Sequence, residues 1–235
     1  MQLGIPQQLW LSVELALRDT IPCYEQVNSA VTLGLSGILR SKVLGSLPLE
    51  PGSRVLDVGC GPGLSSVILV SKVHPGGEVY CLDVLPEMAV AVRERSSRLP
   101  LRPVLARMEE MPFPSGYFDC VVFSYALRDS LNRVRALAEA HRVLKPGGLL
   151  AIVDLFKPGS RAGQELLSMY IRKLVPLVAS AICGLRGRAW RMLHPTYQLM
   201  WTLSCLKTAL AKVGFAVLQV TQLLALAGVV ARKVV

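Results

Sequence analysis

A glycine-rich segment at residues 59–63, with the sequence G-C-G-P-G, follows directly on the apolar run Arg54–Val58, which is typical of a buried strand. Glycines in such a turn let the backbone approach a ligand, because side chains there would collide with it. The G-x-G-x-G spacing is tighter than the G-x-G-x-x-G of loops that bind a dinucleotide pyrophosphate. With a carboxylate two residues ahead, the loop suits an amino-acid head group with a positive amine, and S-adenosylmethionine is such a ligand. The predicted cofactor contacts in this segment are Asp57, Gly59, Gly61, Pro62 and Gly63.

A second carboxylate, Asp83, ends the next apolar run, Glu78–Asp83, twenty residues after the last of these glycines. In nucleoside-binding parallel sheets, a carboxylate at this strand end accepts hydrogen bonds from the ribose hydroxyls. The alternative is that Asp83 only caps a helix predicted to begin at Pro86. The position and spacing favour the ribose contact.

These candidate residues need a sheet to position them, and the chain around them alternates between strand and helix patterns. Strands are predicted at Arg54–Val58, Glu78–Asp83 and residues 103–106, 119–124 and 149–155. Helices are predicted at Leu64–Val73 and residues 86–98 and 129–144. Continuously apolar strands that alternate with helices indicate a parallel sheet covered on both faces. The predicted fold is therefore α/β, a doubly wound, mostly parallel, Rossmann-like sheet.

The last uncharged stretch, residues 213–231, is long enough to span a bilayer. Two glutamines and a threonine near its centre, and its Val/Thr alternation, favour strands over a membrane span. Two strands are predicted there, the last one antiparallel, at residues 216–224 and 229–234.

The regions outside the alternating pattern complete a three-part organisation. Residues 1–50 have the apolar spacing of helices and are predicted to form an N-terminal lid. Residues 159–212 also have helical spacing, are apolar and basic, and are predicted to be an insertion that caps the substrate. The sheet core is predicted to comprise residues 51–158 and 213–235.

Charge is unevenly distributed along the 235 residues, whose net charge is +10. No acid follows Glu165, whereas nine bases do; the rest of the chain holds 17 bases and 16 acids. Hydrophobic residues make up 52% of the chain, which excludes a disordered or fibrous protein. A basic and apolar C-terminal third indicates contact with an anionic surface, such as membrane lipid, nucleic acid or an acidic partner.

The cysteines show neither a C-x-x-C motif nor a cluster with histidine. We expect buried thiols in a reducing compartment, with no disulfide framework and no metal site. The first ten residues also lack the pattern of a secretory signal. The expected location is the cytoplasm. The six cysteines are Cys23, Cys60, Cys81, Cys120, Cys183 and Cys205.

The motifs as a set resemble the class I S-adenosylmethionine-dependent methyltransferases, and within that class the UbiE family of quinone-ring C-methyltransferases. The resemblance covers residues 24–235 and is close for residues 51–158. It implies methyl transfer to a ring carbon of a lipid-soluble quinol precursor in quinone biosynthesis. The elements that carry it are residues 55–63, Asp83, 111–114, 118–119, 142–148, 154–158 and 214–215, and the string 124–129, S-Y-A-L-R-D, beside the family's S-F-G-L-R-N.

The resemblance also departs from the family at the predicted adenine contact. The family has Gly-Asp-Ala-Glu before Leu-Pro-Phe, with the Asp near the adenine amine, whereas this chain has Arg107 at that position. Glu109 or the backbone of Met108 is therefore expected to hold the adenine, and Ser124 is expected beside the cofactor.

Two residues are expected to act in catalysis. Transfer to a ring carbon is helped by deprotonation of the neighbouring phenol, and a cation stabilises the phenolate. Arg128, just past a strand end, is the candidate cation; the alternative is a surface ion pair with Asp129 or Glu139. Tyr24 matches the family's N-terminal Tyr-Asp-x-x-Asn string, which resembles a lid over the cofactor.

The basic third also carries aromatic residues, among them Trp190 and Trp201. This combination fits a peripheral contact with a bilayer, where an isoprenoid substrate would be found. Core helices with basic outer faces, or an RNA-binding surface, are the alternatives. The rival acceptors are therefore another small apolar phenol, sterol or amine, or RNA, and the sequence does not indicate an oligomeric state.

Overall fold

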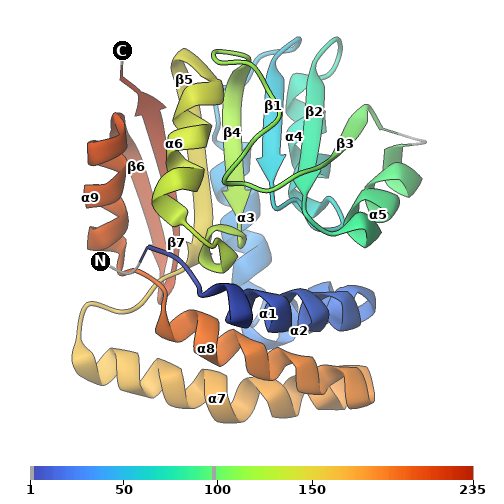
Figure 1. Ribbon diagram of the computed structural model, residues 1–235, viewed down its shortest axis with the longest axis vertical. Coiled ribbons are helices and arrows are strands. Elements are labelled where there is room, and N and C mark those ends of the chain that lie inside the picture. The colour runs from blue at the N-terminus through green and yellow to red at the C-terminus, as the bar shows by residue number, and fades with distance from the viewer. Residues whose placement is uncertain (1–2, 97–98, 235) are drawn as a thin grey trace.

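Seven strands form one sheet in the computed structural model, which describes residues 3–96 and 99–234 (Figure 1). The order is β3-β2-β1-β4-β5-β7-β6; β7 is antiparallel to β5 and β6, and the other neighbours are parallel. The predicted doubly wound sheet is confirmed, and the long uncharged run forms strands. The strands are β1 (Arg54–Val58), β2 (Glu78–Asp83), β3 (Leu101–Leu105), β4 (Phe118–Ser124), β5 (Leu144–Leu155), β6 (Phe215–Leu223) and β7 (Leu226–Lys233).

The parallel register brings the carboxyl ends of the central strands to one edge of the sheet. Val58 at the end of β1 pairs with Leu82 of β2 on one side and with Phe123 of β4 on the other. All three side chains are buried, which explains why these strands are continuously apolar. The loops that follow the three strands therefore meet, and the Gly59 N–H donates to the Leu82 carbonyl at 2.8 Å.

Helices cover both faces of the sheet. α6 (Arg133–Val143) and α9 (Leu203–Val213) pack in the core on one face, and α3 (Leu35–Gly45) and α4 (Leu64–Val73) pack on the other, with α5 (Pro86–Ser96) beside them. The predicted helix at 129–144 begins later, because the Asn132 side chain accepts a hydrogen bond from the Arg135 N–H and caps α6 there. Asp129 lies instead in the short 3₁₀ segment η2 (Leu127–Asp129). The predicted end of α5 at residue 98 lies outside the described residues.

A second helical layer lies beyond the carboxyl ends of the parallel strands, at the bottom of Figure 1. It consists of α1 (Gln7–Thr20), η1 (Ile21–Cys23), α2 (Tyr24–Val31), α7 (Arg161–Cys183), η3 (Gly184–Met192) and α8 (Leu193–Gln198). α7 is its outermost element, and its inner face packs against α2 and Trp190. We call this layer the cap.

The helical segment Arg161–Gln198 is long and apolar enough to cross a membrane, judged by length and composition, and it is the one such segment in the part of the chain that the structure describes. Only 22% of its apolar window is buried. The helices of this segment nevertheless line a cavity against α1 and α2, as described below.

One pair of cysteines contradicts the expectation of free thiols: Cys23 and Cys183 form a disulfide. The two residues are 160 positions apart, and the packing of α2 against α7 brings them together, so no local spacing could have indicated the bond. Cys60, Cys81 and Cys120 are free and buried, as expected. The predicted cytoplasmic location loses the support that it drew from reduced thiols and stays a prediction.

Candidate active site

The glycine loop between β1 and α4 adopts a backbone that favours glycine at three positions, with φ values of 64° at Gly59, 54° at Gly61 and 88° at Gly63. A Cβ at Gly59 would lie 2.4 Å from the Cβ of Ala126, so close packing against the loop after β4 requires glycine there. A Cβ at Gly61 would meet no atom within 4 Å. Gly61 therefore presents its open side to a cavity and not to the protein.

Asp57 lies fully buried beneath this loop. One of its carboxylate oxygens, Oδ2, accepts a hydrogen bond from the Ser66 hydroxyl at 2.6 Å, while Oδ1 has no hydrogen-bond partner among the described residues. Burial raises the pKa of Asp57 to about 6, although the Ser66 hydrogen bond opposes the shift. A buried carboxylate oxygen without a partner is unfavourable in the protein alone, and it fits a ligand that brings a donor or a positive charge.

Asp83 links the glycine loop to the end of β2. Its carboxylate accepts from the Gly61 N–H at 2.9 Å and from the Leu85 N–H at 3.0 Å. Each oxygen keeps a lone pair, so the side chain both holds the backbone here and can accept further hydrogen bonds. Burial raises the pKa of Asp83 above its ordinary value.

The first cavity, which we call the loop cavity, lies over the glycine loop and measures about 100 Å³. Its walls include the predicted contacts Gly59, Gly61, Pro62, Asp83, Arg107, Met108, Glu109 and Ser124, whereas Asp57 and Gly63 lie outside the lining. Trp10 and Leu17 of α1 cover it from the cap side. The structure thus brings together residues from four separate loops that the sequence placed at one site.

Glu109 stabilises the chain segment just before α6. Its Oε1 accepts hydrogen bonds from the Ser130 hydroxyl and from the N–H groups of Leu131 and Asn132, which holds the chain just before α6. Arg107 lies 3.7 Å from the other oxygen of Glu109, and its guanidinium lies 5.5 Å from the centre of the Trp10 ring. The residue that replaces the family's Asp therefore holds α1 over the loop cavity.

Arg40 of α3 is a functional candidate that the sequence did not reveal. Its Nε donates to the Ser124 hydroxyl at 3.2 Å, and it lines the loop cavity on the side of Gly59 and Tyr125. A guanidinium at this point suits a ligand carboxylate. No motif marks Arg40, because it lies in a helix that is otherwise defined only by apolar spacing.

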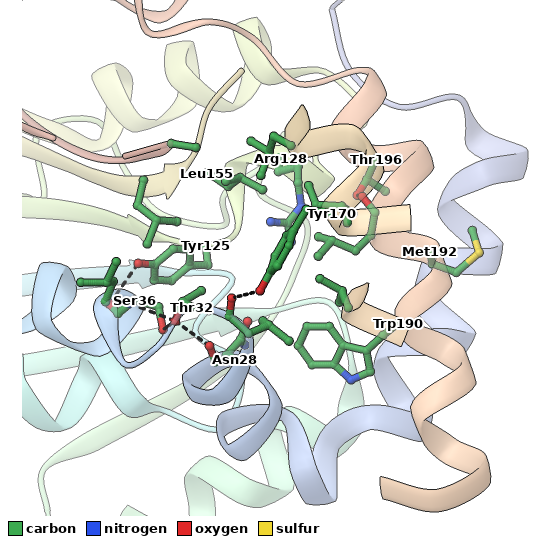
Figure 2. A pocket seen from close by; sticks show the side chains of 18 of the residues that line it. Asn28, Thr32, Ser36, Tyr125, Arg128, Leu155, Tyr170, Trp190, Met192 and Thr196 are labelled. Atoms are coloured by element: carbon green, nitrogen blue, oxygen red, sulfur yellow. Dashed lines mark hydrogen bonds between the residues drawn. The ribbon is translucent and has the colours of Figure 1, made fainter. Parts of the chain in front are cut away.

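The second cavity lies between the sheet edge and the cap and measures about 710 Å³ (Figure 2). We call it the acceptor cavity. Its lining is predominantly apolar, with a few polar groups such as Asn28, Thr32 and Thr196. This size and composition are typical of a site for a small lipophilic molecule. Four residues line both cavities, so the two adjoin there: Leu17, Tyr24, Tyr125 and Asp129.

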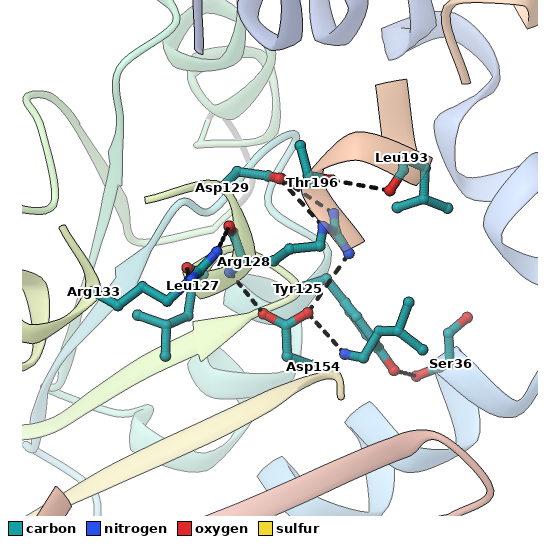
Figure 3. Close-up of polar contacts among 10 residues, drawn as sticks. Ser36, Tyr125, Leu127, Arg128, Asp129, Arg133, Asp154, Leu193 and Thr196 are labelled. Carbon is teal, nitrogen blue, oxygen red and sulfur yellow. Dashed lines mark hydrogen bonds and ion pairs between the residues drawn. The ribbon is translucent and has the colours of Figure 1, made fainter. Parts of the chain in front are cut away.

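Arg128 is buried at the wall of the acceptor cavity. The alternative of an ion pair named the right partner, Asp129 (Figure 3), but its placement at the surface is wrong. Its guanidinium donates twice to Asp129, at 3.1 and 3.2 Å, and lies 3.7 Å from an oxygen of Asp154. Burial alone would disfavour the charge, but the two carboxylates raise the pKa of Arg128 above its ordinary value. Glu139 pairs with Arg142 instead.

The loop that carries Arg128 is fixed from below by two buried groups. Arg133 donates to the carbonyls of Leu127 and Arg128 at 3.2 and 2.7 Å, and Asp154 accepts from the Arg128 N–H at 3.1 Å. Burial raises the pKa of Asp154 to about 6, although the positive charge of Arg128 opposes this. The guanidinium of Arg128 is therefore held in a defined position against the cavity.

Tyr24 lies where the two cavities adjoin, at the start of α2. Its ring stacks on Trp190, with the ring centres 5.6 Å apart. Trp190 and Trp201 are 7% and 3% exposed, so the expectation that these tryptophans rest on a bilayer is wrong. Both were expected at the surface because their neighbours in sequence are basic, but they pack inward, against the cap and against the sheet core.

Comparison with known proteins agrees with this geometry. The family described as a methyltransferase domain matches residues 56–152. The chain is 31% identical over 159 residues to a demethylmenaquinone methyltransferase of Listeria monocytogenes, with 66% of this chain and 67% of the relative covered. It is 34% identical over 149 residues to the ubiquinone/menaquinone biosynthesis C-methyltransferase UbiE of Bordetella parapertussis, and there it covers 63% of itself and 56% of the relative.

Solved structures show the same fold. A SAM-dependent methyltransferase from Aquifex aeolicus superposes with a TM-score of 0.62 at 24% identity, over 83% of this chain and 89% of that one. A possible histamine N-methyltransferase from Thermotoga maritima does so with a TM-score of 0.64 at 17% identity, over 96% and 99%. At these identities the likeness establishes the fold and not the acceptor.

Proposed function

Because this chain belongs to the S-adenosylmethionine-dependent methyltransferases, in the family of the demethylmenaquinone and UbiE C-methyltransferases, we propose that it methylates a ring carbon of a lipid-soluble quinol precursor. One observation carries the proposal: a large apolar cavity shares four wall residues with the glycine-loop cavity. Methyl transfer is an in-line displacement, which requires donor and acceptor to meet at such a junction.

The chain offers partners for each part of S-adenosylmethionine, which supplies an activated methyl group when bound. The guanidinium of Arg40, in the lining of the loop cavity, complements the carboxylate of the amino-acid end. Asp57 lies beneath the loop and outside that lining, so its charge would attract the positive amine through the loop and not by lining the cavity. The open side of Gly61 leaves room for the ligand, and Asp83 keeps lone pairs for the ribose hydroxyls. Since Glu109 is committed to three donors, the backbone of Met108 is the better partner for the adenine.

Arg128 and Asp129 would prepare the acceptor. Loss of the phenolic proton moves electron density onto the ring carbon, and this carbon then attacks the methyl group while the methyl–sulfur bond breaks and leaves a neutral thioether. The methylated carbon then loses its own proton, which restores the aromatic ring and the phenol. Asp129 stands where the family string ends in Asn, and its carboxylate lies at the junction, where it can take that proton. Arg128 would stabilise the phenolate, and Tyr24 and Tyr125 would exclude water from the reacting atoms.

The acceptor class follows from the lining of the acceptor cavity and from the position of the tryptophans. A predominantly apolar cavity of this size favours a lipophilic ring over a nucleotide. Binding of RNA is usually aided by exposed aromatic side chains, and Trp190 and Trp201 are buried. Peripheral contact with an anionic membrane is part of the proposal, because such a lipid is found there.

The test is transfer of labelled methyl groups from S-adenosylmethionine to chemically reduced membrane lipid extract and, in parallel, to RNA. We expect label in the quinol fraction. Arg128→Gln should lower turnover about 10²-fold while keeping cofactor affinity, whereas Arg93→Gln, an exposed change on α5, should have no effect. Label in RNA alone, or an active and folded Arg128→Gln variant, would contradict the proposal.

A further inference from the structure

The acceptor cavity meets solvent at three leucines. Leu33 is 86% exposed, Leu224 is 82% exposed and Leu166 is 65% exposed, and all three also line the cavity. Residues that line a cavity and are this exposed must lie at its opening. They come from three separate segments: the turn between α2 and α3, the turn between β6 and β7, and the first half of α7. We call this rim the leucine portal.

Two of the three portal leucines are held in an unfavourable backbone conformation. Leu33 has a φ of 51° and Leu224 a φ of 56°, and a third residue, Tyr125, has a φ of 58°. These are the non-glycine residues with positive φ within residues 3–96 and 99–234, and all three line the acceptor cavity. Such a conformation is uncommon for a side chain like leucine and concentrates at functional sites. Here it points two apolar side chains into solvent, which does nothing for the folded protein alone.

The outer surface of α7 extends this apolar rim and adds positive charge. Met169 and Leu177 are exposed on the same helix as Leu166, next to the exposed bases Arg172 and Lys173. Glu165, the last acid in the chain, lies in the first turns of α7 and pairs with Arg161, and every charged residue after it is a base. α7 is also the outermost element of the cap in Figure 1. Apolar side chains rimmed by bases complement the acyl layer and the headgroups of an anionic bilayer.

We propose that the leucine portal seats on an anionic membrane, with Leu33, Leu166 and Leu224 in the acyl layer and the bases of α7 at the headgroups. The lipid acceptor would then pass from bilayer to cavity without crossing water. This inference rests on the proposed function for its lipid acceptor, but the binding surface can be tested apart from any activity. The proposed membrane contact is thus made by three leucines and not by Trp190 and Trp201, which are buried.

The test is flotation with vesicles of equal parts phosphatidylcholine and phosphatidylglycerol. Wild type should float and should release as salt rises. The double variant Leu33→Asn/Leu224→Asn should bind at least about tenfold more weakly because two apolar contacts are lost. Asn tolerates positive φ, so this variant should unfold at the same or a higher temperature, which separates binding from folding. The matched control is Leu105→Asn/Leu218→Asn, which changes two exposed leucines outside the cavity and should float like wild type.

Charge is tested separately by Arg172→Glu/Lys173→Glu, since each base near the surface contributes about fivefold to binding. Arg172 and Lys173 lie outside the lining of the acceptor cavity. With a water-soluble quinol that lacks a prenyl tail, the charge variant should therefore turn over like wild type, and with a prenylated quinol in vesicles it should be slower. If no quinol is methylated but the wild type and the variants float as described, the proposed function is wrong, whereas the membrane contact through the leucine portal is supported. The portal inference is overturned if wild type does not float, if the portal variant floats as well as wild type, or if sedimentation shows a dimer through this face without vesicle binding.

Discussion

Replacing Gly61 with alanine isolates the contribution of the glycine loop to cofactor binding. Gly61 has a φ of 54°, and an added Cβ would meet no protein atom within 4 Å. Gly147, an exposed residue near the start of β5, has a φ of 74° and equally open surroundings. Alanine at either position should therefore destabilise the fold only through its left-handed backbone, by about 1–2 kcal/mol. That lowers the melting temperature by about 2–8 °C for a chain of this length.

The two variants should differ in cofactor affinity. At Gly61 the methyl group projects toward a cavity of only about 100 Å³, whereas Gly147 lies at the opposite end of the sheet. Overpacking of this kind costs about 1–3 kcal/mol, which corresponds to roughly 5–150-fold in Kd. Calorimetric titration with S-adenosylmethionine should show this loss for Gly61→Ala and wild-type affinity for Gly147→Ala. If Gly61→Ala is folded and binds like wild type, the loop is not the cofactor cradle, and if both variants lose affinity the effect is global.

Four further changes test the site and the cap. Asp83→Ala should weaken S-adenosylmethionine binding by about 1.5–3 kcal/mol in the same titration, and an unchanged affinity would leave Asp83 with only its backbone contacts. Arg40→Leu should weaken the binding of S-adenosylmethionine but not that of methylthioadenosine, which lacks the amino-acid end. Equal losses of affinity for the two ligands would show that Arg40 does not bind the amino-acid carboxylate. Asp57 has a folded pKa of about 6 against an ordinary value of 3.8, so folding favours its protonated form and stability should fall as pH rises from about 4 to 6. In urea titrations of the Asp57→Asn variant, the free energy of unfolding should fall by on the order of 3 kcal/mol less over this pH range than it does in wild type. If variant and wild type show the same pH dependence, burial does not raise the pKa of Asp57. Cys23→Ser should lower the free energy of unfolding by about 2–5 kcal/mol, and reductant should have the same effect on wild type but none on the variant.

The elements that the sequence predicted correctly are those with an unambiguous local signal. Arg54–Val58 and Glu78–Asp83 were predicted to the residue, because each is a short, mostly apolar run that follows turn-forming residues. β5 was predicted to begin at residue 149 but begins at Leu144. The cause is Lys145-Pro146-Gly147-Gly148, whose composition predicts a turn, although the backbone there continues into the strand.

The loop cavity could be predicted because strand ends in a parallel sheet share an edge, which brings the glycine loop and Asp83 together whatever the details of the helices. Contacts of α3 with the sheet and contacts within the cap had no such rule. Arg40 contacts Ser124 across 84 residues, and the partners that bury Trp190 lie on α2 and α7. Hydropathy describes a segment of chain, but it does not say which side of a helix will find a partner.

The disulfide fixes the carboxyl end of α7. Cys183 closes α7 and is bonded to Cys23 at the start of α2, whereas Leu166 lies seventeen residues earlier on the same helix, roughly 25 Å away at 1.5 Å per residue. If α7 tilted as a rigid body about Cys183, its displacement would grow linearly toward the portal. A tilt of about 10° would move Leu166 by roughly 4 Å, the separation of two carbon atoms in contact, while leaving the stacked rings of Tyr24 and Trp190 almost unmoved. The bond would thus convert a small rotation of α7 into a wider opening at the leucine portal, while the wall beside Tyr24 stayed in place.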